Sequence, residues 1–229
     1  KVQPDLILGT EYNAAQYEVF SQIAPTLLLN WADAEENLNT IAQIVGKSEQ
    51  VEQLIAERIQ QVAGAREEFA AITTDYPNVL MLHANTLQEI YFGNQVFGLC
   101  ASLVRELGFD LVPLGGFDEF DSDTPAVISV ETLPQLDKEA DLIFMFGSSF
   151  SQAKKLRGPD DFEAQQMSAL REAWQKNKIA QSLDASKTGR VHFMPYALCA
   201  GLPGAIGTGL YLEELKEQLL PAHSTLPSN

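Results

Sequence analysis

One long segment without proline, from Ser48 to Ile72, most strongly limits how this chain can fold. Ser48 is suited to cap a helix, and Glu49 places a negative charge in the first turn, where the helix dipole favours it. Gly64 is the only glycine of the segment, and apolar side chains recur at helical intervals: Val51, Leu54, Ile55, Ile59, Val62 and Phe69. This spacing predicts one amphipathic helix of about 24 residues, about 36 Å long at roughly 1.5 Å per residue. Such a helix is longer than a simple crossover needs and could span the width of two domains.

The residues before this helix alternate between strand and helix patterns. Asp5–Gly9 is a short apolar run that ends in glycine, as a buried strand does, and Thr26–Leu29 is a second such run. Apolar residues at helical spacing lie between them, from Asn13 to Ala24. This order predicts a parallel βαβ unit with a right-handed crossover. Leu38–Val45 is expected to form a further short helix that Gly46 ends.

The residues after the helix repeat this alternation. Strands are expected at 78–82, 110–113, 126–130, 141–146 and 190–194. Helices are expected at 94–107, 131–136, 162–176 and 203–220, with loops at 114–123 and 148–161. We therefore predict an α/β protein with two Rossmann-like lobes: 1–47 as the later part of the first lobe, 48–72 as the connecting helix and 73–229 as the second lobe. Because the chain opens inside a strand pattern, without an initiator Met or a signal-like region, we expect it to be truncated at its amino end, with an incomplete first lobe.

Charge and hydropathy exclude several classes of partner. Fifteen Lys and Arg residues face 31 Asp and Glu residues, a net charge of −16, which repels nucleic acids and anionic membrane surfaces. No apolar run approaches the roughly 18 to 20 residues that a membrane span requires. The few basic groupings that could take an anion are Lys154, Lys155 and Arg157, or Arg171, Lys176 and Lys178.

Catalytic and metal-binding motifs are missing from the sequence. It has no nucleophile elbow, no phosphate-binding loop and no dinucleotide fingerprint, and the glycine-rich stretch 204–209 falls inside an expected helix. His83, His192 and His223 lack ligand spacing, and the first two are expected to be hydrogen-bonded structural residues of strands. The acidic residues at 118–123 lack the calcium-loop register and fit a solvated loop. We therefore expect no enzyme activity, no cofactor and no metal site.

The two cysteines, Cys100 and Cys199, form no Cys-x-x-Cys pair. Two small buried thiols are the favoured interpretation. A single disulfide between them remains the alternative if the protein folds in an oxidising compartment.

Several segments, in order and spacing, resemble the periplasmic ferric-siderophore-binding proteins. The resemblance covers nearly the whole chain, and its segments are Pro4–Gly9, Phe20–Thr26, Arg105–Phe109, Ile128–Glu131, Ala140–Phe144, Trp174 with Gly189–Val191, and Pro203–Leu215. It implies two α/β lobes bridged by one helix, with a ferric siderophore held between them and delivered to the permease of an ABC importer. It further implies a location in the periplasm or at the outer face of the cell membrane, and we expect a monomer. Heme or cobalamin carriers of the same fold, and less readily an α/β enzyme, are the alternatives.

Ligands of open α/β sheets bind beyond the carboxyl ends of the strands. This rule, with aromatic residues suited to a large chelate, selects the expected ligand-binding residues: Thr10, Tyr12, Trp31, Asn85, Tyr91, Phe92, Phe117, Ser148, Tyr196 and Leu198. A heme carrier would need an axial Tyr or His from Tyr12, Tyr91, Tyr196 or His83. Because cations are few, with Lys154, Lys155 and Arg157 the best placed, an uncharged hydroxamate complex or a citrate-type complex is favoured over a highly charged catecholate.

Glu131 is the residue expected to contact the permease. In the resembling family, a glutamate at the outer tip of each lobe pairs with permease arginines, and Glu131 falls at the second-lobe position. It begins a predicted helical turn, where a carboxylate is favoured. We therefore expect Glu131 to be exposed and to have no internal Arg or Lys partner.

Overall fold

The computed structural model describes residues 3–30, 33–92, 99–113, 126–147, 159–200 and 204–220, with only the backbone described for 159–166. The contacts divide the chain into two compact units, Lys1–Glu57 and Arg58–Asn229, which are described separately. The expected α/β class is confirmed. Among the described residues, no helix is both long and apolar enough to cross a membrane.

The first unit contains the predicted parallel βαβ element. Strands β1 (Ile7–Thr10) and β2 (Thr26–Leu29) pair in parallel, with Ile7 opposite Thr26. The helix expected at 13–24 is instead a 3-10 turn, η1 (Glu11–Gln16), followed by the short α1 (Tyr17–Ser21). The backbone N–H of Thr10 donates to Asn13 Oδ1 (3.0 Å), which fixes a tight turn directly after the strand.

Helix α2 (Ala34–Ile44) begins about one turn before the predicted start at Leu38. The reason is a cap: Asp33 Oδ1 accepts a hydrogen bond from the N–H of Glu36 (3.0 Å) and satisfies a donor of the first turn. Gly46 ends this region with φ +67°, a conformation that glycine adopts without steric cost.

Helix α3 (Ser48–Asp75) has 28 residues and passes through Gly64 without a break. It extends past the predicted end at Ile72, and in this last turn the hydroxyls of Thr73 and Thr74 donate to the carbonyl of Ala70 (3.1 and 2.8 Å). The boundary between the two contact units, after Glu57, falls within this helix.

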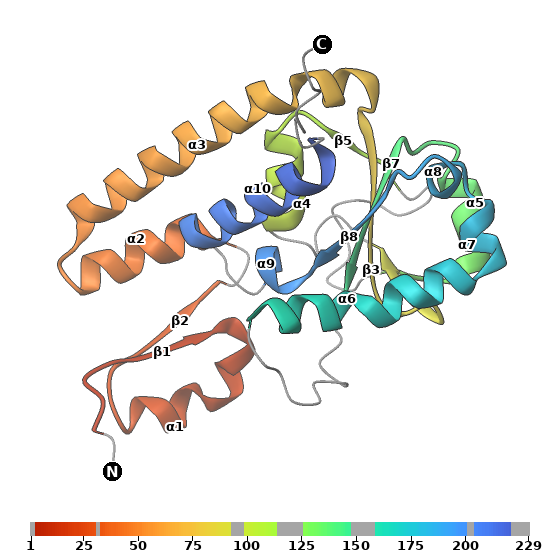
Figure 1. Ribbon diagram of the computed structural model, residues 1–229. Coiled ribbons are helices and arrows are strands. Elements are labelled where there is room, and N and C mark those ends of the chain that lie inside the picture. Colours follow the sequence, from red (N-terminus) through yellow and green to blue (C-terminus); the bar gives the residue numbers. More distant parts are fainter. Residues whose placement is uncertain are drawn as a thin grey trace. The chain divides into compact units, whose positions relative to one another are not determined.

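The second unit is built on a mixed six-stranded sheet (Figure 1). The strands are β3 (Asn78–Thr86), β4 (Glu89–Phe92), β5 (Asp110–Leu111), β6 (Ala126–Ile128), β7 (Leu142–Gly147) and β8 (Val191–Pro195). Their order is β6-β4-β3-β7-β8, with β5 paired to β3. β5, β7 and β8 run parallel to β3, whereas β4 and β6 are antiparallel additions. Strand β4 was not expected from the sequence pattern.

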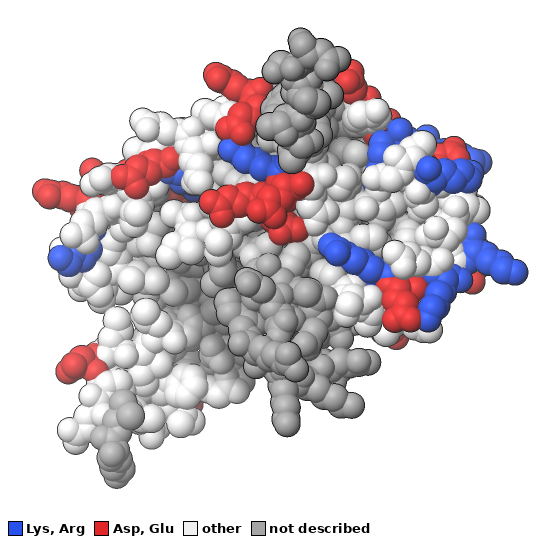
Figure 2. Space-filling model, in the orientation of Figure 1, with Lys and Arg blue, Asp and Glu red and all other residues white. Residues whose placement is uncertain are grey.

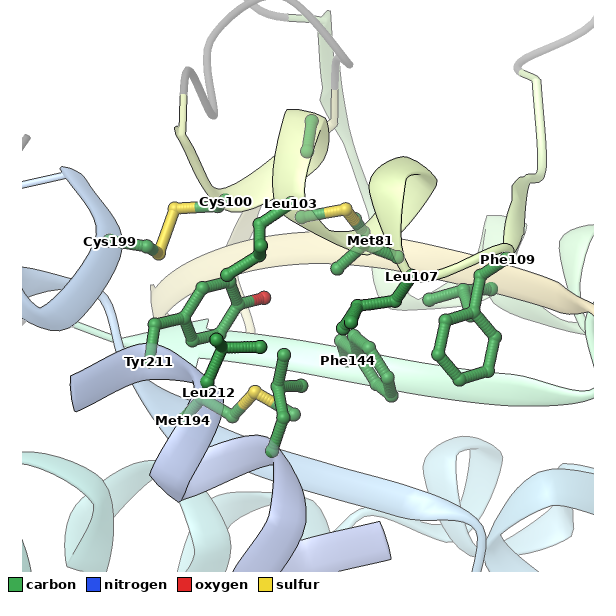
Figure 3. Close-up of a cluster of buried hydrophobic side chains, with 14 of the residues drawn as sticks. Met81, Cys100, Leu103, Leu107, Phe109, Phe144, Met194, Cys199, Tyr211 and Leu212 are labelled. Atoms are coloured by element: carbon green, nitrogen blue, oxygen red, sulfur yellow. A yellow bond between two sulfur atoms is a disulfide. The ribbon is translucent and has the colours of Figure 1, made fainter. Parts of the chain in front are cut away.

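Helices cover both faces of this sheet, and Figure 1 shows α4 and α10 on one side and α5, α7 and α8 on the other. Their bounds, with those of η2, α6 and α9, are η2 (Val130–Thr132), α4 (Leu99–Glu106), α5 (Leu133–Leu136), α6 (Pro159–Lys176), α7 (Lys178–Ser182), α8 (Asp184–Lys187), α9 (Ala197–Ala200) and α10 (Ala205–Leu219). The central strand β7 is buried throughout and alternates between two cores: Phe144 and Phe146 face the first, and Ile143 and Met145 face the second. The first core holds the second half of α3 together with α4, α9 and α10 (Figure 3).

Polar contacts fix the helices of the first core to one another. Arg58 on α3 donates from Nη2 to both carboxylate oxygens of Glu106 on α4 (2.9 and 3.1 Å) and from Nε to the hydroxyl of Thr208 on α10 (3.3 Å). Gly108 follows α4 with φ +101°, a conformation that glycine adopts readily at the end of a helix.

A disulfide joins α4 to α9, so the interpretation of Cys100 and Cys199 as free thiols is wrong (Figure 3). Both cysteines are buried in the first core, and their Cα atoms lie 4.9 Å apart, within the range that a disulfide requires. The sequence separates them by 99 residues. Only the packing of α4 and α9 on the same sheet face brings them together.

Candidate functional site

Three aromatic side chains gather at the carboxyl end of β3 in the second unit. His83 lies opposite Tyr91 of the antiparallel β4, with ring centroids 5.8 Å apart. Tyr196 follows directly after β8, and its ring centroid lies 4.4 Å from that of His83 at an interplanar angle of 50°. We call Tyr91, His83 and Tyr196 the aromatic cluster. It lies where the carboxyl ends of β3, β7 and β8 meet, the position at which open α/β sheets bind ligands.

The aromatic cluster is held from both of its ends. The backbone N–H of Tyr196 donates to the carbonyl of Gly147 at the end of β7 (3.0 Å), and the carbonyl of Tyr196 accepts from the N–H of Ala200 in α9 (3.0 Å). At the other end, the hydroxyl of Tyr91 donates to Glu89 Oε2 (3.1 Å). The rings are therefore fixed by backbone and side-chain hydrogen bonds as well as by packing.

Two groups of the aromatic cluster, the His83 imidazole and the Tyr91 hydroxyl, favour their uncharged forms. Burial lowers the pKa of His83, because the charged imidazolium loses hydration. The hydrogen bond to Glu89 and the charge of that carboxylate raise the pKa of the exposed Tyr91 hydroxyl. At neutral pH the cluster therefore offers a neutral imidazole and a protonated Tyr91 phenol beside the ring of Tyr196, a surface suited to an uncharged or flat-faced ligand.

Of the residues expected to bind ligand, Tyr91 and Tyr196 are brought together by the sheet, and Asn85 lies exposed nearby, where the β3–β4 register shifts between Ala84 and Thr86. Leu198 in α9 is partly buried against the first core. Phe92 is only 4% exposed and packs in the second core, because alternation along β4 turns it to the opposite face from Tyr91. The expectation that Phe92 lines the site is therefore corrected.

The remaining expected ligand residues lie in the first unit or outside the described residues. Thr10 ends β1, and Tyr12 in η1 is 76% exposed. Trp31, Phe117 and Ser148 lie outside the described residues, as do Lys154, Lys155 and Arg157.

Sequence reasoning treated His83 as a structural histidine and missed β4, which supplies its neighbour Tyr91. The signal was present as two short apolar runs, 79–84 and 90–92, on either side of a polar connection. Two such runs fit a hairpin that ends at the ligand edge, but the four residues of β4 are too few to predict it from the pattern alone.

Two residues of the second basic grouping considered as an anion site, Arg171 and Lys176, are engaged in internal contacts. Arg171 donates from Nη2 to the carbonyl of Phe193 (3.2 Å), and its guanidinium lies 5.7 Å from the centroid of the Phe193 ring. Lys176 forms an ion pair with Glu172 in the same helix. Within the described residues, no group of three or more His, Cys, Asp or Glu side chains could hold a metal ion.

Glu131 lies in η2 and is exposed. Hydrogen bonds from the Ser129 hydroxyl and from its own backbone N–H lower the pKa of Glu131, so its carboxylate is charged at neutral pH. The ion pairs among the described residues do not include Glu131. The buried neighbours Val130 and Leu133 anchor the turn that presents this carboxylate.

Three solved structures of bacterial proteins are similar to this chain. FeuA of Bacillus subtilis, a triscatecholate siderophore binding protein complexed with ferri-bacillibactin, is 22% identical with a TM-score of 0.66, over 94% of this chain and 70% of FeuA. FhuD of Vibrio cholerae, bound to Fe³⁺-Desferal, is 16% identical with a TM-score of 0.71, over 96% of this chain and 76% of FhuD. SirA of Staphylococcus aureus is 20% identical with a TM-score of 0.67, over 95% of this chain and 76% of SirA. At these identities the likeness shows the fold.

A comparison with curated protein sequences gives no match. The family comparison is positive: the pattern of the family described as periplasmic binding protein matches residues 1–196, from before β1 to Tyr196 of the aromatic cluster. Its members bind solutes for transport, which confirms the expectation that the chain is not an enzyme. The chain therefore belongs to the periplasmic binding protein family.

Proposed function

We propose that this protein is the substrate-binding component of an ABC importer and that it captures a ferric siderophore at the aromatic cluster. The main support for the proposal is the position of Tyr91, His83 and Tyr196 at the carboxyl ends of the strands, where sheets of this kind bind ligands, in a periplasmic binding protein fold. Flat aromatic rings at such an edge suit the apolar faces of a large iron chelate. The ligand-contact roles of Thr10, Tyr12, Trp31, Asn85, Phe117, Ser148 and Leu198 belong to the same proposal.

The charge around the aromatic cluster favours an uncharged chelate, of hydroxamate type, or a citrate complex of low charge. The protein carries a net charge of −16, and Figure 2 shows acidic side chains spread over α3 and α10, with Lys and Arg side chains around α5, α7 and α8. Lys138 precedes β7, and Lys187 and Arg190 precede β8, so these cations lie at the amino ends of the strands, opposite the cluster. Among the described residues, a triscatecholate complex with several negative charges would find little compensation at the cluster; Lys154, Lys155 and Arg157 lie outside them.

The similar proteins support iron chelates as the ligand class without choosing among them. FhuD of Vibrio cholerae is described with a hydroxamate, Fe³⁺-Desferal, and FeuA with a triscatecholate. A heme carrier is the second candidate, because Tyr91, Tyr196 and His83 are groups that could ligate heme iron.

The same proposal includes a place outside the cytoplasm and a contact with a permease. The Cys100–Cys199 disulfide supports folding in an oxidising compartment, either the periplasm or the outer face of the cell membrane. Glu131, exposed, charged and outside the internal ion pairs, is proposed to pair with basic residues of the importer permease. We propose that the binding protein acts as a monomer.

A panel of four ligands tests the ligand class: ferric desferrioxamine B, ferric citrate, ferri-bacillibactin and hemin. The expected result is quenching of tryptophan fluorescence by the hydroxamate or citrate complex at micromolar or lower concentration, with weaker binding of the catecholate. A Soret shift with hemin and no response to the iron chelates would show that the ligand is heme and not a siderophore. No binding of any of the four would refute the proposal.

A further inference from the structure

The disulfide lies next to the aromatic cluster in the chain and in the fold. Cys199 is the third residue after Tyr196 and lies in α9 (Ala197–Ala200), the single helical turn that follows Tyr196 directly. The ring of Tyr196 lies 4.4 Å from that of His83, and the same tyrosine packs against the core that contains both cysteines. A movement of α9 would therefore carry Tyr196 with it.

The partner of the disulfide, α4, is firmly held. Its residues Leu103 and Val104 are fully buried. Its last residue, Glu106, accepts two hydrogen bonds from Arg58, so side chains fix this end of the helix to α3. Cys100 near the other end provides a covalent link to α9. The disulfide thus connects the segment after β8 to a rigid part of the second unit.

In the described residues, α9 is held by packing against α4 and α10, by a few backbone bonds and by the disulfide, its one covalent link to another helix. A helix of four residues has no stability of its own, since nucleation of a helix is unfavourable. One link to the sheet is the bond from the Tyr196 N–H to the carbonyl of Gly147, at the very end of the β7–β8 ladder. Partial packing of Leu198 and Ala200 against the first core adds to it.

We propose that the Cys100–Cys199 disulfide is a positioning element of the ligand site, which holds Tyr196 against His83 and thereby sets the affinity of the aromatic cluster for its ligand. This inference rests on the proposed function of the cluster. Ligand capture then depends on the oxidation state of the cysteine pair. Reduction by a dithiol breaks the S–S bond and leaves two thiols, while the reductant is oxidised to its own disulfide.

The test replaces the pair by apolar residues, Cys100→Val with Cys199→Ala, in the full chain. Leu215→Ala is the matched control, because Leu215 is fully buried in the same core but lies on α10, away from the cluster. The pKa of His83 is measured by NMR titration, and its signal is identified by its loss in His83→Gln. This pKa reports the contact between the rings of His83 and Tyr196. Isothermal titration with ferric desferrioxamine B reports affinity.

We expect the double variant to raise the pKa of His83 toward the ordinary value of about 6.5, because a loosened Tyr196 lets water reach the imidazole. Affinity should fall about fivefold or more, as expected when an aromatic anchor is lost. Leu215→Ala should lower the melting temperature and leave both readouts unchanged. Wild-type protein treated with dithiothreitol should behave like the double variant.

The positioning role is wrong if the folded double variant keeps the wild-type pKa of His83 and its affinity within about twofold, a difference of about 0.4 kcal/mol. It is also wrong if Leu215→Ala changes both readouts equally. If both the variant and the reduced wild type unfold, the disulfide serves the whole fold and the specific role is refuted. If wild-type protein binds no ferric desferrioxamine B, the proposed ligand fails, and the His83 titration alone still decides the positioning role.

Discussion

The hydroxyl of Tyr211 is a buried polar group without a hydrogen-bond partner in the described part of the chain. Tyr211 lies on α10 and is 0% exposed. Its ring packs edge-on against Phe146, with centroids 6.1 Å apart, and Figure 3 shows it among Leu103, Leu212 and Met194. Burial raises the pKa of this hydroxyl well above its ordinary value, because a phenolate would be poorly solvated there. The group therefore loses hydration on folding and gains no hydrogen bond in return.

Removal of this oxygen should stabilise the protein. A buried hydroxyl without a partner costs about 1 to 3 kcal/mol. Tyr211→Phe removes that cost but leaves a void of one oxygen atom, whose lost contacts offset part of the gain. We expect a net increase of about 1 kcal/mol in the free energy of unfolding, which for a chain of this size raises the melting temperature by about 2 to 4 °C.

Urea unfolding followed by circular dichroism measures this change. Tyr76→Phe is the control: Tyr76 is 37% exposed, so its hydroxyl reaches solvent and its removal should alter stability by less than about 0.5 kcal/mol. If Tyr211→Phe instead destabilises the protein by about 1 kcal/mol or more, the hydroxyl has a partner, such as a buried water, and the reasoning is refuted.

Three further predictions concern folding, pH and transport. The Asp137 carboxylate accepts bonds from two backbone N–H groups at the start of α8 (2.7 and 3.2 Å), so Asp137→Ala should lower the free energy of unfolding by about 1 to 3 kcal/mol, measured in urea. Burial lowers the pKa of His192, so as the pH falls the unfolded chain binds a proton at this residue before the folded protein does. The stabilising contribution of neutral His192 is complete above about pH 6.5 and is lost as the pH falls toward the folded-state pKa. In this pH window the melting temperature of His192→Gln should therefore depend less on pH than that of the wild-type protein. Glu131→Lys should leave ligand affinity unchanged but reduce uptake in cells, most strongly at low salt, whereas Glu139→Lys should transport normally; normal uptake by Glu131→Lys would contradict docking.

The elements with long, regular patterns could be predicted from the sequence. The helix from Ser48 was predicted because its apolar residues repeat over seven turns, and β7 because Leu142–Phe146 is an uninterrupted apolar run. The end of the long helix was placed at Ile72, three residues early, because Thr73 and Thr74 are weak helix formers, yet both are helical in the structure.

The candidate site depended more on tertiary contacts. The strand-end rule selected Tyr91 and Tyr196, but their meeting at His83 required the antiparallel β4, whose four residues give too short a pattern. Phe92 was misassigned because the face of a strand residue depends on register, and a shift of one residue exchanges core and surface. The disulfide joins residues 99 positions apart, a distance at which local patterns carry no information.

Isothermal titration of ferric desferrioxamine B into the wild-type chain, Tyr196→Ala and Tyr76→Ala tests the aromatic cluster most directly. Tyr196 belongs to the cluster, while Tyr76 precedes β3 at the opposite end of the strands. The account predicts that Tyr196→Ala weakens binding by about 1 to 3 kcal/mol, about 5- to 150-fold, and that Tyr76→Ala binds like wild type. Wild-type affinity in Tyr196→Ala, or an equal loss in both variants, would contradict the assignment of the ligand site to the aromatic cluster.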